Sequence, residues 1–430
     1  MEPPQWVDKM HVGLWYRISG NNPDLGLAPT PLGTRYLEDN DPARDPTLNP
    51  PYSRKERLRR MLGRRPLAPW HGSVGFSAIT EAWNGAVFAS RFGPAGSMIV
   101  FGGGHNDYFG SDVHAFDLTS RQWSRILDGY INGDRDSYGT GAVYPNATYP
   151  DGSPLPPHTY DYVQYDSLVN DVLLAKGQTE LGKQVKAIAI PHLLNLDTLS
   201  WRQGPKHEDA ILNSGGWSTW DANRQVLWIH SGDAGGGNAF LAYSPDGENK
   251  DGTFGRWGER YDNKFQNQAN HNCMQIDPAG KVILVVNHQR DALFAINPEI
   301  PALSPAPLRD SGERPELSPY ASLEYSTGLN CFVYYSANDG PNVYGITAPS
   351  PENGSDPLSS VWAWSRLDAR DHSLDPVADA AAQSRYPVNR PHVFGRFRVA
   401  DYDDVALAIL VRHVDSPVYV AKLRGATSKA

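Results

Sequence analysis

The sequence predicts an all-β fold, a single β-propeller of six or seven four-stranded blades. Short apolar runs recur along the chain and are separated by turn residues, as expected for many short strands. Tryptophans close groups of such runs at Trp123, Trp201, Trp257 and Trp364, spaced by one or two blades of roughly 50 residues. The content of 40 Gly, 35 Pro and 11% aromatic residues suits strands joined by turns rather than long helices.

The N-terminal segment, residues 1–25, contains one predicted strand, marked by alternating apolar residues between Val12 and Ile18. No partner strand follows nearby in the sequence. We therefore expect this strand to pair with the C-terminal blade near residues 418–423 and close the ring, which hides two exposed sheet edges. Residues 26–75 form an irregular segment, rich in Pro, Asp and Arg, with one short helix predicted at 53–62.

The blades are assigned to residues 76–423, so that the chain 1–430 forms one domain. The first three blades end at Trp123, Trp201 and Trp257. Blade four lacks a closing Trp, blade five ends at Trp364, and blade six is completed by the N-terminal strand. A long insertion, residues 129–157, separates blades one and two, and loops of this length are more often functional than idle.

Charge, cysteine content and hydropathy narrow the classes of partner. A net charge of −9 argues against the broad basic surface that nucleic-acid binding needs. Two cysteines are too few for a disulfide framework, although they allow one disulfide bridge between adjacent blades. The chain shows no signal-peptide core at its N-terminus and no run of about 18 apolar residues. We expect a monomer with no nucleic-acid or membrane partner, secreted or periplasmic only if a signal peptide has been removed.

The clearest candidate site follows three consecutive glycines in blade one, at positions 102–104. Glycines allow backbone conformations closed to other residues and close approach to neighbouring strands. The polar residues that follow, among them His105, Asn106 and Tyr108, are therefore expected at a strand end, and in a propeller such ends line the central mouth.

Blade two offers residues that converge on the same mouth. His158 and Tyr160 stand at the start of its first strand, and Lys176 ends the partner strand. If the hairpin turns near residues 167–170, Tyr160 and Lys176 lie nearly opposite one another, within reach of a shared ligand. Because innermost strands converge on the axis, His105 from blade one is expected close to this pair.

A His, a Tyr and a cation fit β-elimination from a uronic-acid polysaccharide. A base must remove the proton α to the carboxylate, a cation must stabilise the enolate, and an acid must protonate the departing glycosidic oxygen. His and Tyr suit the proton transfers, and Lys suits the charge stabilisation. We expect an anionic polysaccharide as the partner.

The run from the triple glycine to Trp123 resembles a Kelch-type blade. The segments WNGAVFAS, GGGHNDYFGSDVHAFDL and PPHTYDYVQYD, with a cation at the end of the next strand, resemble the β-propeller ulvan lyases and their uncharacterised relatives. The resemblance implies a polysaccharide lyase acting on an ulvan-like glycan. By position it makes His105 the catalytic His, Tyr160 the catalytic Tyr, and Lys176 the counterpart of the family's charge-neutralising Arg.

Two positions depart from the family pattern. Lys176 stands where the family has Arg, and Lys does not grip a carboxylate in the same bidentate way. The family's second active-site His has no counterpart here, because Arg125 lies near that position. We expect His158 to take its place, and Asn106, Tyr108, Arg125 and Arg290 to contact the substrate.

A second constellation suggests a metal site, since propeller lyases of this kind carry a structural metal. His271 and Cys273 are two apart on a predicted strand, His288 ends the partner strand, and Asp233 lies one blade earlier. These residue types suit zinc, with calcium as the alternative ion and no organic cofactor expected. Cys273 is equally suited to be a small buried core residue.

Other function classes compete with the lyase. A non-catalytic Kelch-like propeller that binds glycan or protein needs only the scaffold. A sialidase-type propeller needs repeated Asp-box turns, which the sequence lacks. A galactose-oxidase-type copper site needs a Cys cross-linked to Tyr, and Cys273 beside His271 is too little to indicate one.

Overall fold

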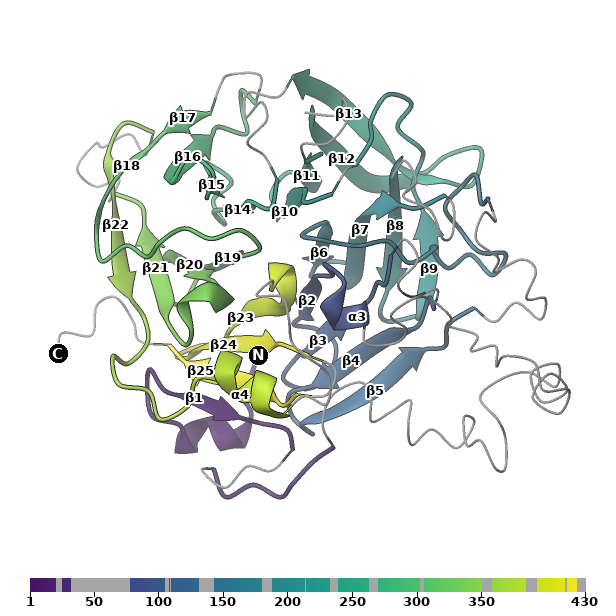
Figure 1. The fold of residues 1–430 in the computed structure, drawn as a ribbon. Coiled ribbons are helices and arrows are strands. Elements are labelled where there is room, and N and C mark those ends of the chain that lie inside the picture. Colours follow the sequence, from purple (N-terminus) through teal and green to yellow (C-terminus); the bar gives the residue numbers. More distant parts are fainter. Residues whose placement is uncertain are drawn as a thin grey trace, which may run out of the picture.

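The computed structural model describes residues 1–20, 25–31, 78–104, 108, 110–130, 143–179, 188–212, 214–232, 239–262, 270–301, 305–349, 358–383, 393–413 and 416–423. The described strands form six sheets arranged as blades around a central axis, and the blades follow one another in chain order (Figure 1). The prediction of an all-β propeller is confirmed, and the open choice between six and seven blades is settled at six.

In blades one to three the four strands pair antiparallel in chain order, from the innermost to the outermost. The strands are β2 (Ala86–Ala89), β3 (Ser97–Val100), β4 (Val113–Asp117) and β5 (Gln122–Leu127); β6 (Val163–Asp166), β7 (Asp171–Gly177), β8 (Ile188–Asn195) and β9 (Ser200–Gln203); and β10 (Trp217–Asp221), β11 (Val226–His230), β12 (Ala239–Glu248) and β13 (Phe254–Asp262).

Blades four to six depart from this pattern at their outer edges. The strands are β14 (Cys273–Ile276), β15 (Ile283–Asn287), β16 (Ala292–Ile296) and β17 (Ala306–Pro307); β19 (Ser322–Ser326), β20 (Cys331–Tyr335), β21 (Val343–Thr347) and β22 (Val361–Arg366); and β23 (Phe397–Asp401), β24 (Ala406–Val411) and β25 (Val418–Lys422). Blade four, which lacks a closing Trp, has a fourth strand of only two residues. In blade five, β18 (Arg309–Gly312) adds a fifth strand parallel to β22.

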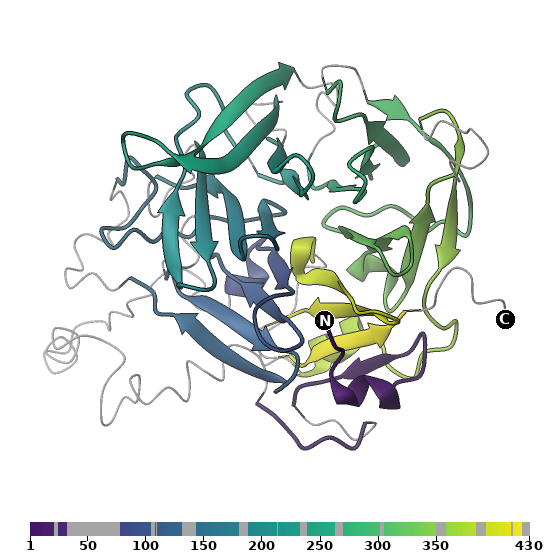
Figure 2. The same cartoon turned by 180° about the vertical axis from the view of Figure 1, so that it is seen from behind.

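The ring closes as the sequence predicted. The N-terminal strand β1 (Trp15–Arg17) pairs antiparallel with β25, with Tyr16 opposite Val420, and becomes the outermost strand of blade six. Figure 2, seen from behind, shows the N-terminal segment along this blade. A 3₁₀ helix, Gln5–Lys9, precedes β1, and its Trp6 Nε1–H donates to the carbonyl of Leu118 at 3.1 Å. The predicted helix at 53–62 lies outside the described residues.

The hydrophobic core is divided into layers between adjacent blades. In β15, Ile283 and Val285 pack toward blade three, whereas Leu284 and Val286 pack toward blade five. Because successive side chains of a strand point to opposite faces, a strand that is covered on both faces needs apolar residues at every position. This explains why the strands read as short, unbroken apolar runs.

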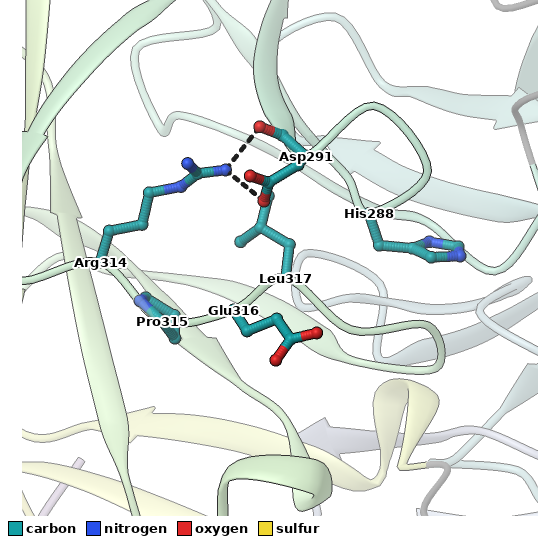
Figure 3. Close-up of a pocket in the computed structure, with 6 residues that line it drawn as sticks. All are labelled: His288, Asp291, Arg314, Pro315, Glu316 and Leu317. Atoms are coloured by element: carbon teal, nitrogen blue, oxygen red, sulfur yellow. Dashed lines mark hydrogen bonds and ion pairs between the residues drawn. The ribbon is translucent and has the colours of Figure 1, made fainter.

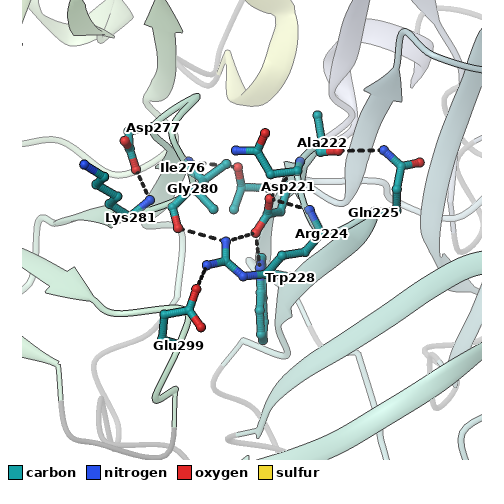
Figure 4. Close-up of polar contacts among 12 residues, drawn as sticks. Asp221, Ala222, Arg224, Gln225, Trp228, Ile276, Asp277, Gly280, Lys281 and Glu299 are labelled. Carbon is teal, nitrogen blue, oxygen red and sulfur yellow. Dashed lines mark hydrogen bonds and ion pairs between the residues drawn. The ribbon is translucent and has the colours of Figure 1, made fainter.

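Polar contacts join neighbouring blades at the hairpin turns. Arg224, in the turn between β10 and β11, donates to the Asp221 carboxylate at 2.8 Å and to the Gly280 carbonyl of blade four at 2.8 Å. It also pairs with Glu299 of blade four (Figure 4). Asp221 is nearly fully buried, so this guanidinium both satisfies a buried carboxylate and ties two blades together.

Helices are few and short in the described chain. Besides the 3₁₀ helix Gln5–Lys9, they comprise α3 (Ala78–Glu81), α4 (Pro376–Gln383) and the 3₁₀ turns Ala337–Asp339 and Phe394–Arg396. In α4, Asp379 accepts hydrogen bonds from Arg17 of β1 and from the Tyr419 hydroxyl of β25, at 2.7 and 2.8 Å, and so fastens the helix to blade six. None of the described helices is both long and apolar enough to cross a membrane.

Candidate active site

The antiparallel order places two kinds of strand end on one face of the propeller. In every blade the innermost strand begins where the second strand ends, so both ends open on the same side. We call this side the mouth face. His158, Tyr160 and His271 precede innermost strands, while Lys176 and His288 end or follow second strands. These five predicted site residues therefore share the mouth face.

The triple glycine of blade one packs directly on blade two. The N–H groups of Gly103 and Gly104 donate to the carbonyls of Pro157 and Pro156, at 3.2 and 2.8 Å. A Cβ on Gly104 would lie 2.0 Å from His158 Cδ2. The glycines thus permit the close approach of the two blades. His105 and Asn106, which follow Gly104, lie outside the described residues, and their roles stay predictions.

Substituting Gly104 with alanine tests this close approach. The backbone of Gly104 is left-handed (φ +79°) and its missing Cβ faces His158, so we expect Gly104→Ala to lower the free energy of unfolding by about 3 kcal/mol. Gly152→Ala is the matched control, because Gly152 has φ +88° but nothing within 4 Å of its Cβ position. That variant should lose only about 1 kcal/mol in urea denaturation. Equal losses in the two variants would contradict the packing argument.

Lys176 and Tyr160 are in contact. The Lys176 Nζ lies 4.5 Å from the centroid of the Tyr160 ring and 5.8 Å from that of Tyr162. An irregularity in the pairing of β7 with β8 falls between Leu174 and Lys176. Lys176 and Tyr160 are each only 3% exposed, and burial lowers the pKa of the Lys176 ammonium from 10.5 to about 7.

Tyr160 belongs to a group of ring-bearing residues at the axis. Each precedes the innermost strand of its blade and has a left-handed backbone, with φ between 40° and 67°. We call this group the axial cluster. Its members are Trp83, Tyr160, His271, Tyr320 and Phe394. Such conformations are uncommon for residues other than Gly, and they cluster where function or packing over-determines them.

Contacts across the axis hold the cluster together. The Tyr160 ring of blade two lies 5.9 Å from His271 of blade four and 5.6 Å from Phe394 of blade six. Backbone hydrogen bonds link neighbours around the ring: the N–H groups of Tyr160, Tyr320 and Phe394 donate to the carbonyls of Trp83, His271 and Tyr320, at 2.7, 3.2 and 3.1 Å. The sequence pattern did not identify Trp83, Tyr320 and Phe394 as site residues. Their common place two or three residues before an innermost strand was the available signal.

His158 lies beside the axial cluster. Its ring centroid is 5.1 Å from Trp83 and 5.9 Å from Tyr160, where it meets the Tyr ring edge-on. The side chain is almost fully covered, with 2% exposure. His158, Tyr160 and Lys176 thus form one contiguous group on blade two, as the sequence indicated.

The predicted zinc ligands are spread over different environments. Left-handed backbone at His271 breaks the strand alternation on which the pairing with Cys273 relied. Cys273 lies in the apolar layer between blades four and five, and burial raises the pKa of its thiol well above the usual value. Within the described ranges, no three His, Cys, Asp or Glu side chains are grouped to hold a metal ion. Asp233 lies outside those ranges, so zinc binding by the full set stays a prediction.

His271 is a neutral ring at neutral pH. Burial, reinforced by the charge of His288, lowers its pKa to about 4. Its Nδ1 is buried, has no hydrogen-bond partner among the described residues and faces Gly215, where a Cβ would lie 2.6 Å away. An unpartnered N–H costs more than an unpartnered lone pair, so the proton of the neutral ring belongs on Nε2.

Three residues that were expected to contact the substrate, Tyr108, Arg125 and Arg290, lie in three different environments. Tyr108 is fully buried and donates to Asp112 at 2.6 Å, and the same carboxylate accepts from His114 at 2.6 Å. The Tyr108 side chain is therefore packed in the hydrophobic layer between blades one and six, and its contact with a substrate stays a prediction. Arg125 lies on β5, the outermost strand, and pairs with Asp128 at 2.8 Å. Arg290 does lie on the mouth face, where its guanidinium stands 5.7 Å from the Phe294 ring.

The described part of the long insertion covers blade two on the mouth face. The Tyr144 N–H donates to the Thr179 carbonyl at 2.6 Å, just past Lys176. Ala147 packs on Gly177, where a Cβ would meet the alanine side chain at 2.8 Å. Tyr149 stacks on Tyr130, with ring centroids 4.9 Å apart. The insertion therefore packs on the end of the strand that carries Lys176.

Comparison with known proteins assigns no family. No family model matches the chain, and no curated protein matches it. Among solved structures, the α-L-arabinanase of Penicillium chrysogenum complexed with arabinobiose is similar at a TM-score of 0.39 and 12% identity, over 81% of this chain and 99% of that one. A chain of a nidogen/laminin complex is similar at a TM-score of 0.37 and 10% identity, over 66% of this chain and 85% of that one. Similarity at this level carries no argument about function.

Proposed function

We propose that this protein is a polysaccharide lyase that cleaves an ulvan-like, uronic-acid-containing anionic glycan by β-elimination. The observation that carries the proposal is the contact between Lys176 and Tyr160, with the Nζ 4.5 Å from the ring centroid, beside His158 and the triple glycine. A cation, a phenol and an imidazole thus share one place on the mouth face. The charge stabilisation expected from the cation is usually the largest single contribution to such catalysis.

In this mechanism the C5 proton of the uronate passes to His105, which acts as base. The C4–O bond to the leaving sugar breaks, a double bond forms between C4 and C5, and Tyr160 gives its proton to the departing oxygen. Lys176 pairs with the carboxylate as negative charge spreads onto it, and His158 and Asn106 position the sugar. After the product leaves, His105 releases the proton it gained to water, and Tyr160 takes up a proton from water.

Burial of Lys176 gives this role a physical basis. Among the residues that the structure describes, no carboxylate pairs with the Lys176 ammonium, and burial lowers its pKa to about 7 because an unpaired charge is costly in an apolar setting. A bound uronate carboxylate would supply the missing counter-charge and favour the protonated form. The site is therefore suited to an anionic ligand more than to a neutral one.

A second candidate function, a non-catalytic propeller that binds glycan or protein, is favoured by a different observation. Tyr160, Lys176 and His158 are each no more than 3% exposed. Side chains so thoroughly covered serve the packing of the blades as readily as they serve a substrate. This candidate predicts binding without turnover.

Ultraviolet absorbance of newly formed unsaturated uronate separates the two functions. We expect the absorbance to rise with at least one of ulvan, heparinoids, chondroitin, alginate and pectate. Tyr160→Phe should lower kcat about a hundredfold, because the proton donor is lost. Tyr162→Phe is the matched control: this tyrosine also flanks Lys176 but has no role in the mechanism, and it should retain the parental rate. No absorbance change with any glycan that binds would favour the non-catalytic propeller.

A further inference from the structure

A pocket opens on the mouth face, between blades four and five. Its volume is about 450 Å³, within the range of small-ligand sites. His288 and Asp291 line it from the turn between β15 and β16, and residues 314–317 line it from the connection to blade five (Figure 3). None of these residues contributes to the contact between Lys176 and Tyr160.

His288 presents a hydrogen-bond acceptor. Its backbone N–H and its Nδ1 both approach Asn272 Oδ1, at 3.2 and 3.0 Å. Since a backbone N–H donates only, the Asn272 atom is an acceptor, and Nδ1 must therefore carry the proton. With this proton on Nδ1, the other nitrogen of the neutral ring, Nε2, is a lone-pair acceptor.

The other polar groups of the pocket are also mainly acceptors. Arg314 is already engaged: it donates to the Asp291 carboxylate and carbonyl at 2.7 and 2.6 Å, and its Nε lies 3.2 Å from Asp310. The exposed carboxylate of Glu316 has no hydrogen-bond or ion-pair partner within the described part of the chain. The pocket thus holds unneutralised negative charge and repels a carboxylate ligand.

Apolar surface completes the site. Pro315 is buried and Leu317 is only 6% exposed, and both line the pocket next to the carboxylates. A sugar ring combines hydroxyl donors at its edge with C–H groups on its faces, and it matches this mixture of acceptors and apolar wall. The pocket also adjoins the axial cluster, because His288 bonds to Asn272, the neighbour of His271 in the chain.

We propose that this pocket binds an uncharged sugar residue, whose hydroxyls donate to Glu316 and to His288 Nε2. It would serve as a subsite for a neutral unit of the glycan, next to the place where the uronate is cleaved. That assignment to the same glycan rests on the proposed function, whereas the binding of an uncharged sugar in the pocket does not. Lys176 would then bind the charged unit of a glycan chain, and this pocket would bind an uncharged unit of the same glycan chain.

Binding is tested on the full chain by saturation-transfer NMR and titration calorimetry. The uncharged probes are the methyl glycosides of glucose, galactose, mannose and xylose; glucuronate is the anionic probe and glucosamine the cationic one. We expect saturable binding of at least one methyl glycoside, and binding of glucuronate at least tenfold weaker. Glu316→Ala and His288→Leu should each weaken the methyl glycoside about tenfold, since a hydrogen-bond acceptor is lost.

A matched control and the assay for turnover keep the outcomes distinct. Glu259→Ala removes an exposed carboxylate on the outer strand β13 and should leave sugar binding unchanged. Tighter binding of glucosamine than of every methyl glycoside, equal binding of glucuronate, or binding unaffected by Glu316→Ala would each overturn the proposal. Sugar binding that depends on Glu316 without any lyase product would uphold this site and reject the proposed function.

Discussion

Replacing Lys176 with methionine is expected to lower kcat/KM about a thousandfold on any glycan that the protein cleaves. In the proposed mechanism the ammonium offsets the negative charge that builds up on the uronate carboxylate in the transition state, and loss of one such group costs about 10²–10³ in rate. Methionine keeps the length and the apolar stem of lysine. The rate of unsaturated product formation measures the loss, and a variant with more than a tenth of the parental activity would contradict the role of Lys176.

The same residue predicts a pH dependence. Burial lowers the pKa of Lys176 to about 7, so in the free enzyme the cation is present below pH 7 and is lost as the pH rises. We therefore expect kcat/KM to fall above about pH 7, by up to tenfold per pH unit. Lys176→Arg should move this fall to higher pH, because a guanidinium stays charged. An unchanged alkaline limb in that variant would assign the fall to another group.

Stability should change in the opposite direction to activity. The pKa of Lys176 is lower in the folded state than the ordinary value of 10.5, so between pH 7 and 10.5 the unfolded chain binds more protons and stability rises with pH. Below about pH 7 the full cost of burying the charge is present. Lys176→Met removes that cost, and the variant should melt at a higher temperature than the parent at pH 6. The difference should shrink by pH 10. A gain in stability joined to a loss of turnover is typical of a residue kept for function.

The blades were predictable from the sequence because each strand is covered on both faces. A run such as Ile283–Asn287 reads as unbroken apolar because its alternate residues serve two different neighbouring blades. The pairing of β1 with β25 was predictable from a lone strand without a local partner. The contact of Lys176 with Tyr160 followed from hairpin register, which is a local property of two adjacent strands.

The axial cluster was not predictable in this way. The left-handed backbone at Tyr320 and Phe394 accompanies contacts with rings of other blades at the axis, and the propensities of Tyr and Phe do not signal it. The burial of the Tyr108 side chain was not predictable for a related reason. Sequence distance from the glycines indicates the end of a strand, whereas the direction of a side chain at that end depends on packing against the neighbouring sheet.

The environment of Arg398 was also not predictable from its neighbours in the sequence, and this residue has the largest expected effect on stability. In the sequence it alternates with apolar residues of β23, as a solvent-facing residue would. In the structure it is 5% exposed and donates to the carbonyl oxygens of Ala86 and Val163 in blades one and two, at 2.7 and 3.1 Å. It also pairs with Glu324 of blade five and lies 3.7 Å from Asp161 of blade two.

Arg398→Met is therefore expected to lower the free energy of unfolding by about 3–5 kcal/mol, because it leaves the buried Asp161 carboxyl and the largely covered Glu324 carboxyl without their cation. Burial raises the pKa values of Asp161 and Glu324, and the charge of Arg398 opposes that rise. Without the guanidinium the pKa values should climb further, so the folded variant would hold protons that the unfolded chain has released. Its stability should then fall as the pH rises, and its deficit relative to the parent should be smaller at pH 5 than at pH 8. Urea denaturation at the two pH values measures this.

Two further variants decide whether the buried charges are the cause. Arg370→Met removes an arginine that is 75% exposed and paired with Glu313 at the surface, and it should change stability by less than about 1 kcal/mol. Adding Asp161→Asn and Glu324→Gln to Arg398→Met removes the stranded charges and should recover part of the loss and abolish its pH dependence. If the triple variant were no more stable than Arg398→Met at pH 8, the loss would come from the hydrogen bonds to Ala86 and Val163 alone. The guanidinium would then join the blades through their backbones rather than through its charge.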